Sequence, residues 1–224
     1  MSLISFTNKG IYCEQGDFYI DPWLPVDYAV TTHGHADHVR FGNKHYLCET
    51  ITGSIIKRRI SEDLDVSTLD YGVAMVRNGV NISFHPAGHI VGSAQVRLEY
   101  KGEICVISGD YKTEYDGIST AFEPVKCHSF VTESTFGLPI YTWKKQEEVF
   151  ENIRNWVAAN LAQNKTSVLI AYSLGKAQRL IKNLTGGQPI YVHQSIANLN
   201  EVIRNHHIDL PETTTITPDL TKDI

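Results

Sequence analysis

The feature that most constrains this chain of 224 residues is the six-residue string HGHADH, which follows the strand-like run YAVTT. It places four potential metal ligands close together in the sequence: His33, His35, Asp37 and His38. Imidazole and carboxylate groups bind borderline metals such as zinc at about 2.0–2.2 Å. The sequence therefore predicts a fold in which a β-strand ends in a metal-binding loop.

Two further candidate ligands occur in similar contexts later in the chain. His89 lies in the glycine-rich string HPAGHIVGSA, and Asp110 ends the buried-strand pattern VISGD. Six ligands are too many for one ion and suit two. Two divalent ions about 3.5–4 Å apart polarise a phosphoryl group and generate hydroxide near neutral pH. The spacing thus favours a two-metal hydrolytic site.

The order of these motifs resembles the metallo-β-lactamase fold. Residues 132–137 (TESTFG) and 174–179 (LGKAQR) are similar to signatures of its nucleic-acid-cutting branch, the β-CASP nucleases. Residues 16–23 (GDFYIDPW), 92–100 (GSAQVRLEY) and 136–141 (FGLPIY) resemble the DNA ligase-associated putative exonuclease group. The resemblance covers nearly the whole chain.

The resemblance implies a division of the six ligands between two ions. The first ion would be held by His33, His35 and His89. The second would be held by Asp37 and His38, with Asp110 as the bridge. A hydroxide between the ions would then attack phosphorus. We expect zinc, with manganese as the alternative metal.

The resemblance also assigns catalytic roles to Asp37 and Glu133. Glu133 would orient a histidine that protonates the leaving oxygen. Relatives carry two more histidines after the Gly-Lys-Ala-Gln segment, whereas this chain offers only His193, His206 and His207 there, in different contexts. We therefore expect the amino-terminal part of such an enzyme, with an occupied first metal site and a weaker, more open second site. Two further histidines, His85 and His128, are expected to be structural.

Nucleic-acid contacts are predicted where an apolar run at 167–172 precedes Ser173 and Lys176. A strand followed by a helix start is expected there, with Ser173 as the helix cap, and helix amino termini bind phosphate. The net charge of −5 is not that of a typical nucleic-acid binder. Two bound divalent ions would, however, add four positive charges where a phosphate must lie.

Several functions remain open on the sequence alone. A DNA exonuclease acting with a DNA ligase and a helicase follows from the resemblance. An RNA-processing nuclease of the same branch is the main alternative. A glyoxalase-like ester hydrolase and an inactive binding fragment are further alternatives, and Glu133 with the Gly-Lys-Ala-Gln segment argues against the ester hydrolase.

The expected fold has two parts. Residues 1–142 carry hairpin signals at Asn78-Gly79 and Lys101-Gly102, which predict β-rich sheet layers with flanking helices, including one at 54–60. Residues 143–224 predict a parallel α/β segment that resembles the start of a β-CASP cassette. Its expected order is helix 144–161, strand 167–172, a second helix, strand 189–192, helix 199–203 and a loop at 211–215.

Composition places the chain among soluble globular proteins. The apolar fraction is 42%, the charged fraction is 20%, and there is no apolar run of eighteen residues. The four cysteines form no CxxC pair, and the amino terminus lacks a secretion signal. We therefore expect a cytoplasmic protein without a membrane segment.

Overall fold

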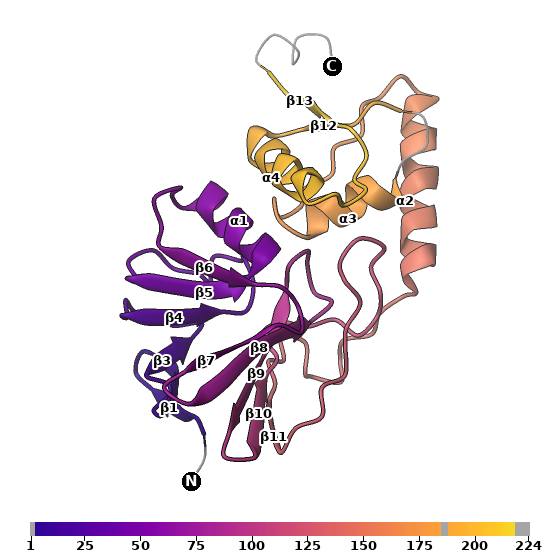
Figure 1. Cartoon of the computed structure of the whole chain (residues 1–224). Coiled ribbons are helices and arrows are strands. Elements are labelled where there is room, and N and C mark those ends of the chain that lie inside the picture. The colour runs from indigo at the N-terminus through magenta and orange to yellow at the C-terminus, as the bar shows by residue number, and fades with distance from the viewer. Residues whose placement is uncertain (1–2, 185–187, 218–224) are drawn as a thin grey trace. The chain divides into compact units, whose positions relative to one another are not determined.

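The computed structural model describes residues 3–184 and 188–217 (Figure 1). It divides into two compact units, Met1–Glu133 and Ser134–Ile224. The division lies before the boundary at 142/143 that the sequence pattern indicates. Both units mix helices and strands, so the fold is of the α/β type. None of the described helices is long and apolar enough to cross a membrane.

The first sheet of unit 1 contains six strands in sequential order. These are β1 (Ser5–Thr7), β2 (Gly10–Cys13), β3 (Phe18–Ile20), β4 (Tyr28–Thr31), β5 (His45–Glu49) and β6 (Val66–Leu69). Strands β1 to β3 pair antiparallel, whereas β3 to β6 pair parallel. The carboxyl ends of β3 and β4 consequently lie at the same edge of the sheet.

The second sheet has the order β11-β10-β9-β8-β7. Its strands are β7 (Ala74–Arg77), β8 (Val80–Pro86), β9 (Ala94–Tyr100), β10 (Glu103–Ile107) and β11 (Ser129–Val131). Both predicted hairpins are confirmed, and all four turn residues, Asn78, Gly79, Lys101 and Gly102, have positive φ. Strands β8 and β10 both run antiparallel to β9. They therefore end at the same edge.

The main core lies between these two sheets. It joins Phe18, Ile20 and Val30 of the first sheet to Phe84 and Val96 of the second, together with similar residues. A smaller cluster packs helix α1 (Thr50–Arg59) on the first sheet.

Helix α1 begins four residues before the predicted start at residue 54. Glu49 caps it, because its Oε2 accepts hydrogen bonds from the backbone N–H groups of Ile51 at 2.8 Å and Thr52 at 3.1 Å.

Unit 2 contains α2 (Gln146–Leu161), α3 (Lys176–Asn183), α4 (Gln194–Asn205), β12 (Tyr191–Val192) and β13 (Thr214–Thr215). The long predicted helix is confirmed within two residues, and α4 extends the predicted helix at both ends. Strands β12 and β13 pair parallel. The prediction of a loop is therefore wrong at residues 214–215, where the backbone finds a neighbouring strand.

The predicted buried strand at 167–172 is wrong. The side chains of Val168 and Tyr172 are each 75% exposed, and that of Ile170 is 95% exposed. Within residues 3–184 and 188–217, the backbone groups of residues 168–171 make no hydrogen bond. An apolar, β-branched run forms a strand only where a neighbouring chain satisfies its N–H and C=O groups, and the described part of unit 2 supplies none.

The predicted helix cap at Ser173 is also wrong, since Gly175 is the N-cap of α3. Gly175 has φ +89°, a conformation that an L side chain rarely adopts. The side chain of Gln178 accepts a hydrogen bond from the Gly175 N–H through Oε1 at 2.7 Å. Gln178, at the third helical position, thereby satisfies the N–H of the N-cap residue, whereas a serine cap would satisfy an N–H inside the first turn.

Candidate metal centre

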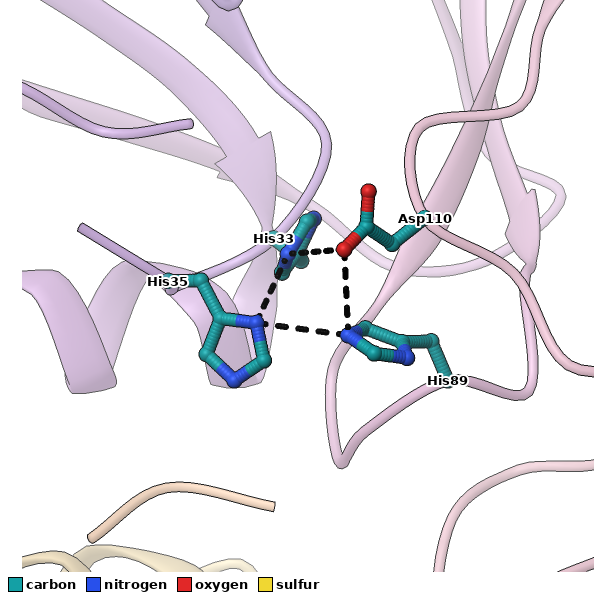
Figure 2. Close-up of side chains that lie close together, drawn as sticks. All are labelled: His33, His35, His89 and Asp110. Atoms are coloured by element: carbon teal, nitrogen blue, oxygen red, sulfur yellow. Dashed lines mark hydrogen bonds and ion pairs between the residues drawn. The ribbon is translucent and has the colours of Figure 1, made fainter. Parts of the chain in front are cut away.

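The strand ends of both sheets bring the predicted ligands together. Loop 32–38 follows β4, His89 lies after β8, and Asp110 lies after β10. Figure 2 shows the ring nitrogens of His33, His35 and His89 and one oxygen of Asp110 directed toward a common point. These four ligand atoms all lie within 4.8 Å of one another.

The separations in this group suit a single cation. His35 Nδ1 lies 3.1 Å from His33 Nε2 and 3.2 Å from His89 Nε2. Asp110 Oδ2 lies 3.9 Å from His33 Nε2 and 3.5 Å from His89 Nε2. Donors around a tetrahedral ion with bonds of about 2.1 Å stand roughly 3.4 Å apart. Nitrogen and oxygen donors of this kind fit zinc or manganese.

Burial keeps two of these histidines neutral. The buried position of His33, with the neighbouring histidines as a further cause, lowers its pKa well below the usual value. Burial likewise lowers the pKa of His89 to about 4. Neutral imidazoles offer a free lone pair to a metal near pH 7.

Two hydrogen bonds of Thr32 determine which ring nitrogen of His33 carries the proton. Thr32 Oγ1 donates to Asp21 Oδ2 at 2.6 Å and lies 3.0 Å from His33 Nδ1. Because the hydroxyl proton is already used, Thr32 accepts from the Nδ1–H of His33. The Nε2 atom is then left unprotonated toward the other ligands.

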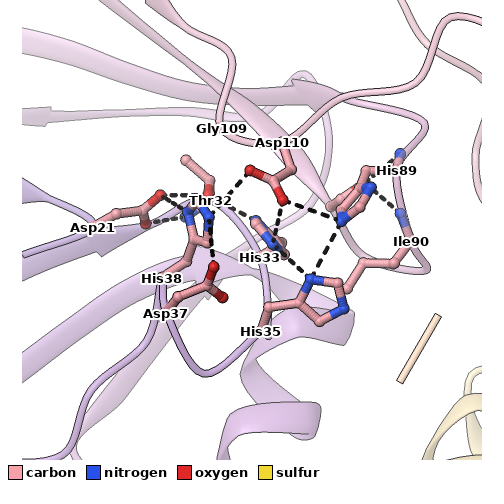
Figure 3. Close-up of polar contacts among 12 residues, drawn as sticks. Asp21, Thr32, His33, His35, Asp37, His38, His89, Ile90, Gly109 and Asp110 are labelled. Atoms are coloured by element: carbon pink, nitrogen blue, oxygen red, sulfur yellow. Dashed lines mark hydrogen bonds and ion pairs between the residues drawn. The ribbon is translucent and has the colours of Figure 1, made fainter. Parts of the chain in front are cut away.

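The predicted second half of the centre, His38 and Asp37, lies beside the other oxygen of Asp110 and outside this group of four (Figure 3). His38 Nε2 lies 3.1 Å from Asp110 Oδ1 and 3.8 Å from Asp37 Oδ2. The side chain of Asp37 is 75% exposed, whereas that of His38 is 16% exposed. Asp110 therefore faces both halves, one oxygen to each.

His38 differs from the other histidines in its protonation. Burial lowers the pKa of His38, but hydrogen bonds to Asp110 and Asp21 outweigh it and raise this pKa to about 10. For Asp110, burial raises the pKa, and the contact with His38 outweighs this effect and lowers it. In this arrangement His38 is a cation held between two carboxylates.

Asp21 is a residue of the centre that the sequence analysis did not identify. Its Oδ1 accepts from the Thr32 N–H at 2.8 Å, and its Oδ2 accepts from His38 Nδ1 at 2.7 Å. A carboxylate behind a ligating histidine fixes the ring orientation and raises its basicity. Asp21 directly follows β3, the parallel neighbour of β4. Its position at a strand end was the available signal, but only the strand pairing places it beside His38.

The loops of the two sheets pack against each other without spare room. Gly109 has φ +54°, and a Cβ atom there would lie 2.6 Å from Thr32 Oγ1. The Ala94 N–H donates to the Thr32 carbonyl at 2.8 Å. Ser93 Oγ accepts from the His89 N–H at 3.1 Å. These contacts fix the three ligand-bearing loops relative to one another.

Glu133 lies outside the group of metal ligands. It follows β11, which runs parallel to β10, and its backbone N–H donates to Ser108 Oγ at 3.3 Å. The strand end that carries Glu133 is thus next to the loop of Asp110. The Glu133 side chain is exposed.

The histidines that were predicted not to bind metal lie apart from this group. His85 Nδ1 lies 3.1 Å from Glu123 Oε1, and His128 Nδ1 accepts from the Ile104 N–H at 3.0 Å. His193 is the N-cap of α4, where its Nδ1 accepts from the Ser195 N–H. His206 and His207 follow α4. In the described residues, these histidines belong to no cluster of three or more metal-ligand side chains.

Ser173 and Lys176, the predicted nucleic-acid contacts, lie before and at the start of α3. Lys176 is exposed, with Nζ 5.5 Å from the centroid of the Tyr172 ring. Gln178 of the same segment is 1% exposed and donates to Asn200 Oδ1 at 2.9 Å. The glutamine of the Gly-Lys-Ala-Gln segment therefore joins α3 to α4, and Lys176 remains open to solvent.

Comparison with curated proteins finds nucleic-acid enzymes. A protein of Opitutus terrae named "Probable DNA ligase" is 28% identical over 91% of this chain and 20% of its own length. "Endoribonuclease YSH1" of Yarrowia lipolytica is 28% identical over 52% of this chain and 14% of its own length. The human "DNA cross-link repair 1A protein" is 24% identical over 65% of this chain and 15% of its own length. The chain thus spans a fifth or less of the length of these relatives.

The comparison with solved structures supports the fold and gives no information on function. No family model matches the chain. A crystal structure of a protein of unknown function from Enterococcus faecalis V583 superposes with a TM-score of 0.57 at 12% identity. The match covers 86% of this chain and 54% of that protein.

Proposed function

We propose that this chain is a metallo-β-lactamase nuclease of the β-CASP branch, which hydrolyses phosphodiester bonds of nucleic acid in a metal-dependent reaction. Its similarity to proteins named for DNA ligation, RNA cleavage and DNA cross-link repair supports this proposal. DNA is the proposed substrate, with exonucleolytic cutting in association with a DNA ligase and a helicase. The relatives named for DNA ligase and DNA cross-link repair support the choice of DNA. The four free cysteines fit a reducing compartment such as the cytoplasm.

One observation carries this proposal: the two oxygens of Asp110 face two different ligand groups. Oδ2 lies 3.5 Å from His89 Nε2, and Oδ1 lies 3.1 Å from His38 Nε2. A carboxylate placed in this way suits a pair of cations, and paired cations suit phosphoryl chemistry. A single-ion hydrolase would need only one of the two groups.

The proposed roles follow from this arrangement. His33, His35 and His89 would hold the first ion, Asp37 and His38 the second, and Asp110 both. Zinc or manganese ions bound there would polarise the phosphoryl group and lower the pKa of water. Asp21 orients His38, and Thr32 orients His33. Glu133 is proposed to orient the group that protonates the leaving oxygen.

Ser173 and Lys176 are proposed to contact the phosphate backbone. The exposed ammonium group of Lys176 supports this role. Replacing Lys176 with alanine should weaken binding of an oligonucleotide and reduce the slope of log affinity against log salt by about 1. Unchanged affinity and slope would contradict the contact.

The test of the function is hydrolysis of a single-stranded DNA oligonucleotide and of bis-p-nitrophenyl phosphate with added Zn²⁺ or Mn²⁺. We expect turnover that Asp37→Ala reduces about 100-fold or more, since a ligand of the second ion is lost. Asp63→Ala removes an exposed carboxylate outside the centre and serves as the matched control. Metal binding without turnover would indicate an inactive binding fragment. Turnover of thioesters but not phosphodiesters would indicate a glyoxalase-like hydrolase.

RNA is the second candidate substrate, and the similarity to Endoribonuclease YSH1 favours it. Two cations act on the phosphodiester group that both polymers share. DNA and RNA strands of the same sequence, digested side by side, separate the two candidates. A faster rate on RNA would overturn the choice of DNA.

A further inference from the structure

An exposed aromatic cluster lies at the beginning of unit 2. Phe136, Tyr141 and Trp143 are 55%, 43% and 70% exposed. The ring of Phe136 meets Tyr141 and Trp143 edge-on, with centroids 5.1 and 4.9 Å apart. The rings of Tyr141 and Trp143 are nearly parallel, at 7°, with centroids 6.2 Å apart. The three rings support one another while large parts of their faces stay in water.

Solvent-exposed rings in mutual contact need an explanation, because soluble proteins seldom expose contiguous apolar patches without a function. Leu138 and Ile140, between these rings in sequence, are also 62% and 75% exposed. Nucleobases are flat and apolar on both faces, so an open aromatic ring binds them by stacking, with little dependence on sequence.

Two lysines follow the cluster in sequence and offer cationic groups to a phosphate. Residues 134–145 contain no carboxylate and end in Lys144 and Lys145. Lys144 pairs with Glu148 at 2.8 Å. Lys145 makes no ion pair within residues 3–184 and 188–217 and stays available. Glu147 and Glu148 follow in the first turn of α2, so within the described residues Lys145 is the basic group next to the rings in sequence that pairs with no carboxylate.

We propose that Phe136, Tyr141 and Trp143 form a base-stacking platform for single-stranded nucleic acid, with Lys145 contacting an adjacent phosphate. The inference rests on the proposed nuclease function and names a binding site for its substrate. An unpaired strand exposes the faces of its bases, whereas a duplex keeps them stacked inside. The platform therefore selects single strands or frayed ends.

The test is binding of fluorescent oligo-dT and oligo-rU to the full chain in EDTA, which prevents cutting, measured by anisotropy. We expect Trp143→Ala to weaken binding about 5- to 100-fold, the range for loss of one stacked base. Trp143→Phe should restore most of the affinity. Trp156→Ala is the matched control, because Trp156 is a 44% exposed tryptophan of the same unit outside the cluster.

Two further measurements separate bases from phosphates. An abasic oligonucleotide should bind the wild-type and Trp143→Ala chains equally, because it keeps phosphates and lacks bases. Lys145→Ala should lower the salt slope by about 1, whereas Trp143→Ala should leave the slope unchanged.

The outcomes distinguish this inference from the proposed function. The platform is overturned if the Trp143→Ala chain binds oligo-dT and oligo-rU as tightly as the wild-type chain does. It is also overturned if the wild-type chain binds neither oligonucleotide. Bis-p-nitrophenyl phosphate has no base, so its hydrolysis reports the metal centre alone and decides whether the nuclease proposal survives. Loss of self-association in Trp143→Ala, seen by sedimentation, would instead assign the cluster to a contact between copies.

Discussion

The three-histidine half of the metal centre and the His38 half share Asp110 but are prepared differently for a cation. His33 is fully buried and His89 is 26% exposed, and burial keeps both rings neutral. In the other half Asp37 is 75% exposed, and His38 carries a proton held by two carboxylates. The first half presents free lone pairs in place, whereas the second must lose a proton and order an exposed side chain.

This difference shows that residue type alone does not set the affinity of a ligand group. Both halves use imidazole and carboxylate, yet only the first presents buried, neutral rings directed toward a common point. Fixing an exposed side chain and releasing a proton both make metal binding less favourable. The first ion should therefore bind more tightly than the second.

The largest effect is expected for Asp110→Asn, because it removes the charge that both halves share. Phosphodiesterase turnover should fall by about 1,000-fold or more. Metal content after dialysis, measured by mass spectrometry, should fall from near two ions per chain to one or none. A variant that retains two ions would show that the halves do not depend on Asp110.

A matched pair of variants tests whether the halves are separable. His35→Ala should remove the first ion, since His35 Nδ1 is near both His33 and His89. Asp37→Ala should weaken only the second ion, by about 10- to 100-fold, as the loss of one exposed ligand implies. Calorimetric titration with Zn²⁺ resolves the two events. If both variants lose both ions to the same extent, the two halves do not bind their ions separately.

Asp21→Asn addresses the support behind the second half. The amide keeps one oxygen but cannot accept at both positions, so His38 loses its charged partner. Loss of such a support typically weakens metal binding by about 10- to 100-fold. We expect the second ion to weaken more than the first, because Asp21 contacts His38 directly and reaches His33 only through Thr32. An equal effect on both ions would show that Asp21 supports the loop as a whole.

The affinity for the second ion should rise with pH, by up to about tenfold per pH unit, whereas the affinity for the first ion should not. With a pKa of about 4, His89 is neutral from pH 6 to 8, so its protonation leaves the affinity for the first ion unchanged in this range. With a pKa of about 10, His38 must release a proton, so the second ion binds more tightly as pH rises. Titrations in buffers of different ionisation enthalpy count the released protons. Release of no proton with the second ion would contradict the protonated His38.

Much of the centre could be predicted from the sequence because each ligand directly follows a strand signal. The structure places His33, His35, His89 and Asp110 around one point, as expected for ligands that follow strands. Their roles as metal ligands remain a prediction. Asp21 also follows a strand, but this position alone does not place it in the centre. Its contact with His38 depends on the parallel pairing of β3 with β4, and pairing is a long-range property that local pattern does not contain.

The segment 167–172 marks the opposite limit. Its composition predicts a buried strand as strongly as that of β10, yet Ile170 is 95% exposed and the buried Val106 of β10 is fully covered. The difference lies in the neighbours: β10 pairs with β9 and β11. Strand propensity is a capacity to pair, and partners elsewhere in the structure decide whether it is realised.

The absence of a side chain at Gly109 sets how closely two loops that are distant in sequence can approach. With a Cβ only 2.6 Å from Thr32 Oγ1, any larger residue at 109 would compete with Thr32 for the same space. Thr32 holds Asp21 and His33, while Asp110 is the next residue along the chain. Residue 109 is therefore a spacer of minimal thickness between two loops of the candidate centre. A side chain there would have to displace Thr32 and also adopt a φ of +54°, so a smaller residue at 32 alone would not accommodate it.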